Sequence, residues 1–361
     1  MAVEKVDIKT FLELAKIHPV LDARSPAEFA HARFPGAFNL PLFSDEERKV
    51  VGTAYKQQGR RAAIKIGLGY FGTRMREMVE IVENLLKSRE EAQLLNTTGI
   101  VLAHCWRGGM RSAAVAWLLD IYGFKVYLLE GGYKNFRHYV LETFKIPCSF
   151  LILGGYTGSA KTYILHEWLQ QGVKVIDLEG LANHKGSAFG EVGKQPSQEM
   201  FENLVACQLR ACIEQPSGIA GDKIWLEDES QRIGSVIIPQ DFWEQMRHSP
   251  VCFLEVPFNE RLEHIVIEYG GGAREKLADS IIRIQKRLGG LETKNAVRYL
   301  QENNLVECFK ILLTYYDKCY LKSFESRVDS LSHIKISCET VAANVNALKI
   351  LDYLSYKPAS V

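Results

Sequence analysis

The segment GIVLAHCWRGGMRS, residues 99–112, decides the fold class because it joins an apolar run to a glycine turn and then to a helix. Residues 99–104 form a compact apolar run, which is typical of a buried parallel strand. The segment SFLILGGYTGSAKT, residues 149–162, has the same order of strand, glycine turn and helix. Strands that alternate with helices in this way predict an α/β fold.

Working outward from these two segments, the same pattern continues on both sides. A helix is expected after Ser25, because Pro26 and Glu28 complete a capping box. An amphipathic helix is expected over residues 76–90, and the chain beyond residue 273 has a largely helical pattern. Short buried strands are predicted at residues 19–23, 125–129, 174–177, 224–226 and 251–256, with a further short strand after the turn-rich loop at 34–41.

The length of 361 residues exceeds what one core usually spans, so two domains are expected. The first is placed at residues 1–145, with a basic insertion at about residues 48–76. The second is placed at residues 146–361 and has a helical C-terminal part.

The overall composition excludes several classes of protein. Lys and Arg number 44 against 43 Asp and Glu, so a uniformly basic coat for nucleic acid is excluded, although a local patch is not. Eight cysteines without a Cys-x-x-Cys pair argue against a zinc ribbon and a disulfide-stapled fold. No stretch approaches the roughly 18 apolar residues of a membrane helix, and no apolar run follows the first residues. A cytoplasmic protein without membrane association is expected.

The loop after the first quoted strand has the residues of a nucleophilic site. Cys105 precedes a helix and stands beside Arg107 and Arg111, an arrangement that favours the thiolate, which is the nucleophilic form. Gly108 and Gly109 allow backbone amides to turn inward and form a nest for an oxyanion or a persulfide-like adduct. A buried cysteine with two surface arginines is the alternative.

The loop after the second quoted strand has the register of a phosphate-binding loop. Its expected phosphate or diphosphate contacts come from the glycine-rich backbone, a lysine and two hydroxyl groups, namely Gly155, Gly158, Ser159, Lys161 and Thr162. Ala160 occupies the position of the second glycine; it fits if its φ is negative and otherwise reshapes the cradle. A glycine turn without a ligand is the alternative.

Acidic residues follow two more predicted strands of the second half. In KIWLEDES, residues 223–230, Glu227 and Asp228 resemble a Walker B pair that holds magnesium or orients a nucleophile, and solvated acids at a strand end account for the pattern almost as well. Residues 177–180 and 184–190 form another polar, glycine-dense loop, for which a flexible surface turn is equally plausible. No residue is assigned to a resident metal, and Mg²⁺ is compatible with these acids.

The basic insertion has the charge pattern of a nucleic-acid contact. Residues 48–76 contain eight basic residues and no acid, with Tyr55, Tyr70 and Phe71 interleaved. Positive charge suits a polyanion, and aromatic rings suit stacking on unpaired bases. The candidate RNA-binding residues are Lys56, Arg60, Arg61, Lys65, Arg74 and Arg76. A second basic cluster at residues 274–298 is accounted for equally well as a solvated helix face.

The first half resembles a rhodanese (sulfurtransferase) domain. The resemblance rests on DARSPAEF at residues 22–29, FPGA and NLP at residues 34–41, the Cys105 loop, and GGY at residues 131–133. Single rhodanese domains usually place the loop arginine five positions after the cysteine, whereas Arg111 is six positions after Cys105. This longer ring resembles the loop of the cell-cycle dual-specificity phosphatases and suits an anion larger than a terminal sulfur, namely phosphate, thiophosphate or selenophosphate.

Together with GYTGSAKT, WLEDES and Arg232-Ile233-Gly234, these motifs resemble the tRNA 2-selenouridine synthases over nearly the whole chain. The resemblance implies a rhodanese-like α/β domain followed by a P-loop NTPase-like α/β domain. It implies replacement of sulfur by selenium in 2-thiouridine at the tRNA wobble position, with selenophosphate as donor, no tightly bound cofactor, and an S-geranylated intermediate made from geranyl diphosphate. In this scheme Cys105 takes selenium as a perselenide, and Lys161 stabilises the departing diphosphate.

The same motifs are compatible with two alternative functions. One is that of a generic sulfurtransferase or cysteine phosphatase with an attached P-loop domain, which the spacing from Cys105 to Arg111 permits. The second is that of a nucleotide-regulated RNA-binding module in which Cys105 has no chemical role.

Overall fold

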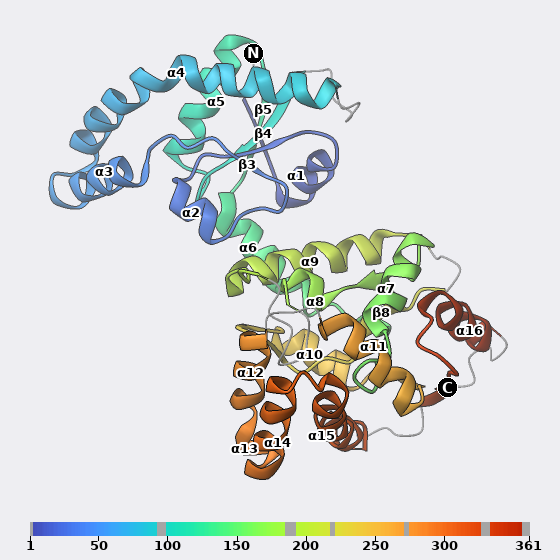
Figure 1. The fold of residues 1–361 in the computed structure, drawn as a ribbon. Helices are drawn as coiled ribbons and strands as arrows, with labels where there is room; N and C mark the ends of the chain where they lie inside the picture. Colours follow the sequence, from blue (N-terminus) through green and yellow to red (C-terminus); the bar gives the residue numbers. More distant parts are fainter. Residues whose placement is uncertain are drawn as a thin grey trace. The chain divides into compact units, whose positions relative to one another are not determined.

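The computed structural model describes residues 3–91, 99–184, 193–216, 221–270, 274–325 and 333–355. The chain forms two compact units. Unit 1 comprises residues 1–143 together with residues 202–207, and unit 2 comprises residues 144–201 and 208–361. Each unit has its own sheet, as Figure 1 shows, and its own hydrophobic core.

Unit 1 is built on a five-stranded parallel sheet in the order β1-β5-β4-β2-β3. The central strand β4 (Ile100–His104) is buried along four of its five residues, as expected for a strand with neighbours on both sides. The strands expected at residues 19–23 and 125–129 are both present. They are β2 (Val20–Asp22) and β5 (Lys125–Leu129), and the other two strands of this sheet are β1 (Glu4–Val6) and β3 (Phe38–Asn39).

The helices of unit 1 include two that contain the basic segment. The helix expected over residues 76–90 begins much earlier, because α4 runs from Arg60 to Glu91 and packs against α3 (Asp45–Gln57). Gly67 of α4 lies close to Phe43, which precedes α3, and a Cβ at Gly67 would lie 3.1 Å from the Phe43 ring. Figure 1 shows the long α4 beside α3. The remaining helices are α1 (Ile8–Ala15), α2 (Pro26–His31), α5 (Met110–Tyr122) and α6 (Gly132–Thr143).

Unit 2 has a second five-stranded parallel sheet, in the order β12-β11-β6-β8-β7. Its central strand β6 (Phe150–Gly155) is fully buried. The predicted strands at residues 174–177, 224–226 and 251–256 are confirmed as β7 (Val175–Ile176), β8 (Ile224–Glu227) and β11 (Val251–Glu255). A small antiparallel pair consists of β9 (Arg232–Ile233) and β10 (Val236–Ile237).

The helical character of the C-terminal part is confirmed, with one exception that the sequence pattern did not indicate. The edge strand β12 (Ile334–Ser337) pairs with β11, and only one of its four residues is buried, so its apolar signal is weak. The helices of unit 2 are α7 (Lys161–Gln170), α8 (Leu178–Leu181), α9 (Gln198–Glu214), α10 (Gln240–Arg247), α11 (Phe258–Gly270), α12 (Arg274–Arg283), α13 (Gln285–Leu288), α14 (Gly290–Gln301), α15 (Leu305–Glu325) and α16 (Ala343–Ser355).

The two sheets confirm the predicted α/β class and determine where the polar loops gather. The Cys105 loop follows β4, and the Gly131–Gly132 pair follows β5, so both lie at the carboxyl edge of the first sheet. The loop before Lys161 follows β6, and Glu227 ends β8, at the carboxyl edge of the second sheet. Ligands of open α/β sheets bind at this edge. No helix in the described part of the chain is long and apolar enough to span a membrane.

Candidate functional site

The thiol of Cys105 lies at the end of β4, directly before α5. The residue is only 3% exposed, and the hydroxyl of Ser112 donates to its sulfur at 3.2 Å. In the loop between Cys105 and Ser112, the backbone amides of residues 106–111 have no hydrogen-bond acceptor among the described residues, as expected for a helix N-terminus. The loop therefore combines a sulfur atom with a set of unpaired N–H donors, which is the arrangement that an anion-binding nest requires.

The Gly131–Gly132 pair supports this loop from the neighbouring strand end. The amide of Tyr133 donates to the Cys105 carbonyl at 2.8 Å, and the amide of Lys134 donates to the Trp106 carbonyl at 2.9 Å. Gly132 has a φ of +60°, and a Cβ there would lie 2.3 Å from the Cys105 carbonyl oxygen. The first turn of α6 thus holds the loop by its backbone.

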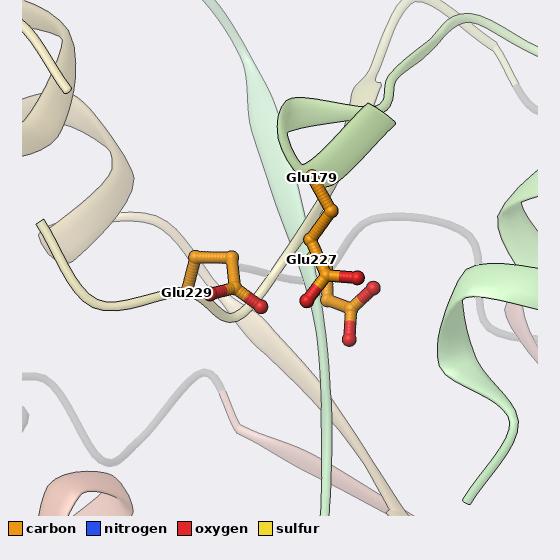
Figure 2. Close-up of side chains that lie close together, drawn as sticks. All are labelled: Glu179, Glu227 and Glu229. Atoms are coloured by element: carbon orange, nitrogen blue, oxygen red, sulfur yellow. The ribbon is translucent and has the colours of Figure 1, made fainter. Parts of the chain in front are cut away.

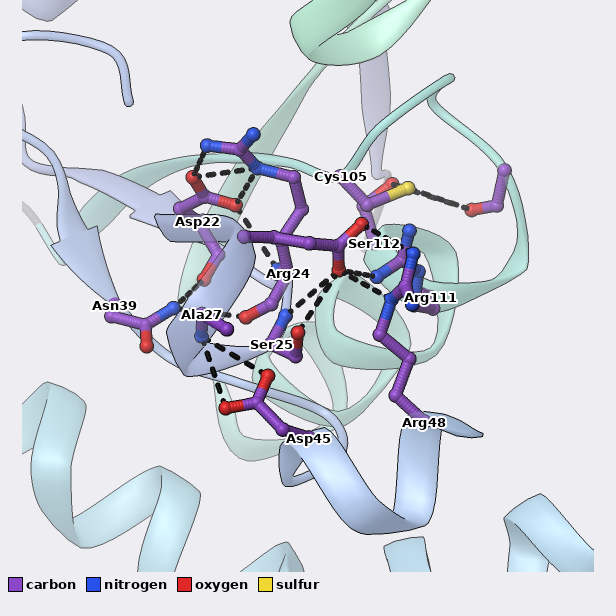
Figure 3. A network of polar contacts seen from close by, with 12 residues as sticks. Asp22, Arg24, Ser25, Ala27, Asn39, Asp45, Arg48, Cys105, Arg111 and Ser112 are labelled. Atoms are coloured by element: carbon purple, nitrogen blue, oxygen red, sulfur yellow. Dashed lines mark hydrogen bonds and ion pairs between the residues drawn. The ribbon is translucent and has the colours of Figure 1, made fainter. Parts of the chain in front are cut away.

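A buried ion pair lies next to the same loop. Arg24 and Asp22 are both almost fully buried and are joined at 2.6 Å, and the Arg24 guanidinium lies 3.8 Å from the centre of the Tyr133 ring. His104 is buried beside them, and burial lowers its pKa. Asp22 and Arg24 of the DARSPAEF motif therefore have a structural role. Figure 3 shows this ion pair together with Cys105.

Arg111, which sequence reasoning assigned to the anion-binding loop, forms an ion pair with Glu28 at 2.6 Å. Arg48 also contacts Glu28, at 2.8 Å. Burial by itself raises the pKa of Glu28, but hydrogen bonds and charge from Arg111 and Arg48 lower that pKa to about 2. Glu28 therefore stays ionised and orients Arg111, whereas Arg107 is exposed. The sequence indicated Glu28 only as a capping residue, and that cap is present.

We expect Gly132→Ala to disrupt the Cys105 loop without touching the sulfur. A left-handed φ costs an alanine about 1–2 kcal/mol, and the new Cβ would also meet two backbone atoms of the loop, at 2.3 and 2.4 Å. The free energy of unfolding should therefore fall by more than ~2 kcal/mol, measured by thermal or urea unfolding.

The matched control is Gly99→Ala, because Gly99 has nearly the same φ, +62°, and its added Cβ would meet only the Phe124 ring at 3.7 Å. An equal loss of stability in the two variants would contradict the proposed backbone contact.

The phosphate-loop register at residues 155–162 also forms a strand–turn–helix junction. Lys161 begins α7 and is 6% exposed; its ammonium group donates to the Gly155 carbonyl at 3.1 Å and lies 3.5 Å from Glu227. Gly158 has a φ of +84° and lies against the backbone of Arg261. Ser159 is fully buried, and its hydroxyl donates to the Tyr156 carbonyl.

Ala160 does not meet the condition under which an alanine fits this loop easily. Its φ is +56° and its ψ is 30°, in the left-handed region. A non-glycine residue there costs about 1–2 kcal/mol, so the residue before Lys161 is strained. Strain of this kind is retained where the surrounding structure over-determines the backbone.

Three buried carboxylates meet beside Lys161 and Thr162. Figure 2 shows the three side chains, Glu179, Glu227 and Glu229. Carboxylate oxygens of Glu179, Glu227 and Glu229 all lie within 4.8 Å of one another. The Thr162 hydroxyl donates to Glu227 at 3.0 Å and to Glu179 at 3.3 Å. Burial and the charge of Glu179 raise the pKa of Glu227 to about 7, and burial with both neighbours raises the pKa of Glu229 well above its usual value.

The structure thus places Glu227 beside Lys161 of the phosphate loop and adds two acids, Glu179 and Glu229, that sequence reasoning did not assign. Glu179 follows β7, and the only sequence signal for its role was its place in the polar segment 177–180. Residues 185–190 of the same predicted loop lie outside the described residues. Asp228 is also buried. The Lys161 ammonium lies 5.3 Å from the centre of the Tyr320 ring on α15, and no sequence signal connects the two residues. A cavity of about 190 Å³ is lined by Lys161, Thr162, Glu179, Glu227 and Tyr320, but not by Asp228 or Glu229.

The six candidate RNA-binding residues all lie on α3 and α4. Lys56, Arg60, Arg61 and Lys65 are exposed. Arg74 and Arg76 instead contact acids, at 3.3 Å from Glu47 and 2.7 Å from Glu80. The Arg60 guanidinium lies 3.9 Å from the sulfur of Met110, so the start of α4 is close to the first residue of α5 and to the loop that contains Cys105.

Comparisons with known proteins agree with this geometry. A model of the rhodanese-like domain matches residues 6–139, and a model described as the tRNA 2-selenouridine synthase AAA domain matches residues 148–274. A protein of Pseudomonas putida strain F1 is 36% identical over 84% of this chain and 86% of its own length. Another, of Sulfurovum sp. strain NBC37-1, is 35% identical over 84% of this chain and 87% of its own length. Both are named tRNA 2-selenouridine synthase, and the chain therefore belongs to the tRNA 2-selenouridine synthase family.

Proposed function

We propose that this protein replaces sulfur by selenium in 2-thiouridine at the tRNA wobble position, with selenophosphate as donor and an S-geranylated uridine as intermediate. The observation that carries the proposal is the Cys105 loop, in which a buried sulfur accepts from Ser112 beside unpaired backbone amides. The names of the relatives support tRNA as the substrate.

The overall exchange balances without an oxidant or a reductant. The sulfur on C2 first attacks C1 of geranyl diphosphate, the C1–O bond breaks, and diphosphate leaves. Selenium then bonds to C2, the C2–S bond breaks, and geranyl thiol departs. Selenophosphate and water supply the selenium and become phosphate. Alkylation is needed because sulfur leaves C2 more readily as a thioether than as a thione.

The proposed role of Cys105 is to release the selenium nucleophile. Its thiolate attacks phosphorus of selenophosphate held on the loop amides, the P–Se bond breaks, and hydrogen selenide leaves with the electron pair. Cys105 then carries a phosphoryl group, which water removes. The spacing from Cys105 to Arg111 suits a tetrahedral anion, and the Ser112 hydroxyl stabilises the sulfur between the two transfers. The perselenide expected from the sequence would instead expel phosphite and require a thiol reductant.

The proposed role of the second loop is to hold diphosphate. Lys161 stabilises the negative charge that develops as diphosphate departs, and the amides around Gly158 and Ser159 position its oxygens. The oxygen-rich set of Thr162, Glu227 and Glu179 fits a hydrated Mg²⁺, since hard carboxylate and hydroxyl oxygens are its usual ligands. When bound, such an ion supplies charge neutralisation for the leaving group. Burial and the charge of Glu179 raise the pKa of Glu227, and the charge of a bound cation would oppose both effects.

The proposed tRNA contact is the exposed basic surface of α3 and α4. Lys56, Arg60, Arg61 and Lys65 supply its charge, and Arg60 brings this surface close to the first residue of α5. Binding through these residues should weaken as salt rises, because each phosphate contact releases counterions.

Nucleoside mass analysis tests the whole proposal. Purified protein is incubated with 2-thiouridine tRNA and geranyl diphosphate, with and without selenophosphate. We expect S-geranyl-2-thiouridine without the donor and 2-selenouridine with it. Formation of neither nucleoside, together with turnover of a simple phosphate ester or thiosulfate without tRNA, would favour the cysteine phosphatase or the generic sulfurtransferase instead.

A further inference from the structure

An apolar groove lies between α3, α4 and the first turn of α5, entirely within unit 1. Its volume is about 610 Å³, inside the range of about 300–1,000 Å³ that is typical of ligand sites. The floor is formed by buried Leu42, Phe43 and Phe71. At the mouth, Leu68 and Met110 are 59% and 50% exposed, which is unusual for large apolar side chains that line one cavity.

The charged side chains that line this groove are all basic among the residues that the structure describes. Of the described residues that line the groove, four are basic, namely Arg48, Lys49, Lys56 and Arg111, and none is acidic. Arg48 and Arg111 are both paired with Glu28, whereas Lys49 and Lys56 are exposed on α3. The groove therefore fits an apolar chain that is attached to an anion.

The groove also shares residues with the catalytic loop. Met110 and Arg111 line the groove and stand five and six positions after Cys105 in the same strand–loop–helix segment. A chain held in the groove would end beside the loop at which selenium is released.

We propose that this groove binds the geranyl chain of S-geranyl-2-thiouridine tRNA and holds it during the exchange of sulfur for selenium. The identity of the chain rests on the proposed function. The groove anchors the leaving group, so that C2 of the uridine lies next to the selenium source, and geranyl thiol is released from the groove after the C2–S bond breaks.

Charge continuity argues for the tRNA-bound chain rather than free geranyl diphosphate. The basic surface does not end at the groove, because Arg60, Arg61 and Lys65 extend it along α4. A diphosphate needs only a compact cluster of cations, whereas a nucleic acid that carries the geranyl chain fits a longer basic surface.

Gly52→Phe tests the proposal by filling the groove. Gly52 lies on α3 and lines the groove, and a Cβ there meets nothing within 4 Å, so the fold should tolerate the change. Replacing a helical glycine should even favour the helix. The matched control is Gly69→Phe, because Gly69 lies on α4, has equally open surroundings and does not line the groove.

Two measurements are made on both variants and on the unsubstituted protein. The first is the affinity for S-geranyl-2-thiouridine tRNA relative to 2-thiouridine tRNA. We expect the unsubstituted protein and Gly69→Phe to prefer the geranylated tRNA by at least ~10-fold, equal to ~1.4 kcal/mol, and Gly52→Phe to lose that preference. The second is the rate of each chemical step. Gly52→Phe should slow selenation of pre-geranylated tRNA and leave geranylation unchanged.

Each outcome decides the proposal. No preference for geranylated tRNA in the unsubstituted protein would overturn it. Slowed geranylation with normal selenation in Gly52→Phe would also overturn it and would identify free geranyl diphosphate as the occupant. The affinity measurement requires no turnover, so failure of the proposed selenation chemistry is distinguished from failure of the groove.

Discussion

Cys105→Ala should lower the rate of selenium incorporation by at least ~1,000-fold, the scale on which loss of a catalytic nucleophile is felt, and should leave geranylation nearly unchanged. The physical reason is that selenide release requires the thiolate, whereas alkylation of 2-thiouridine does not. The measurement is single-turnover selenation of pre-geranylated tRNA, together with geranylation from geranyl diphosphate.

Three controls separate chemistry from folding. Cys319→Ala removes an exposed cysteine and should have no effect. Cys105→Ser keeps the size of the side chain near Ser112, so its thermal unfolding should match that of the unsubstituted protein while selenation is still lost. Added hydrogen selenide should restore selenation in Cys105→Ala. Normal selenation in either Cys105 variant would remove the nucleophile from the mechanism.

The mass of the acid-quenched protein identifies which group Cys105 carries. With selenophosphate present, we expect the mass of a phosphoryl group on the peptide that contains Cys105. A selenium adduct with release of phosphite would establish the perselenide and contradict attack at phosphorus.

Lys161→Ala should give the opposite pattern, lowering geranylation ~100- to 1,000-fold while selenation of pre-geranylated tRNA continues. Loss of one charged donor to a developing anion typically has this magnitude. The variant also leaves Glu227 without the ammonium group that lies 3.5 Å away and lowers its pKa, so the pKa of that carboxyl should rise from about 7. The measurement is the rate of S-geranyl-2-thiouridine formation at several concentrations of geranyl diphosphate.

Lys174→Ala is the matched control for Lys161→Ala. Lys174 is about as buried as Lys161, at 5% exposure, and it pairs with Asp222 at 3.3 Å. It does not line the phosphate-loop cavity. Equal losses of geranylation in the two variants would indicate a general effect on folding. An unchanged rate in Lys161→Ala would reject the diphosphate assignment.

The sequence alone determined the features that depend on local geometry. The two strand–loop–helix segments, the glycine turns and the capping box at Ser25 were predicted correctly, because each is encoded within a few residues by apolar runs and by φ preferences. The α/β class followed from their alternation. Where local patterns were weak, prediction failed: the start of α4 was misplaced because glycines interrupt the helical pattern, and β12 was missed because it is half exposed.

Tertiary structure alone decided which distant side chains meet. Glu28 joins Arg111 across 83 positions, Tyr320 covers Lys161, and Glu179 and Glu229 gather beside Glu227. The groove likewise exists only because α3, α4 and α5 pack together around Phe43 and Phe71. Such contacts depend on sheet order and helix packing, which bring together residues far apart in the chain, whereas the pattern of a single segment reports only its own burial and backbone conformation.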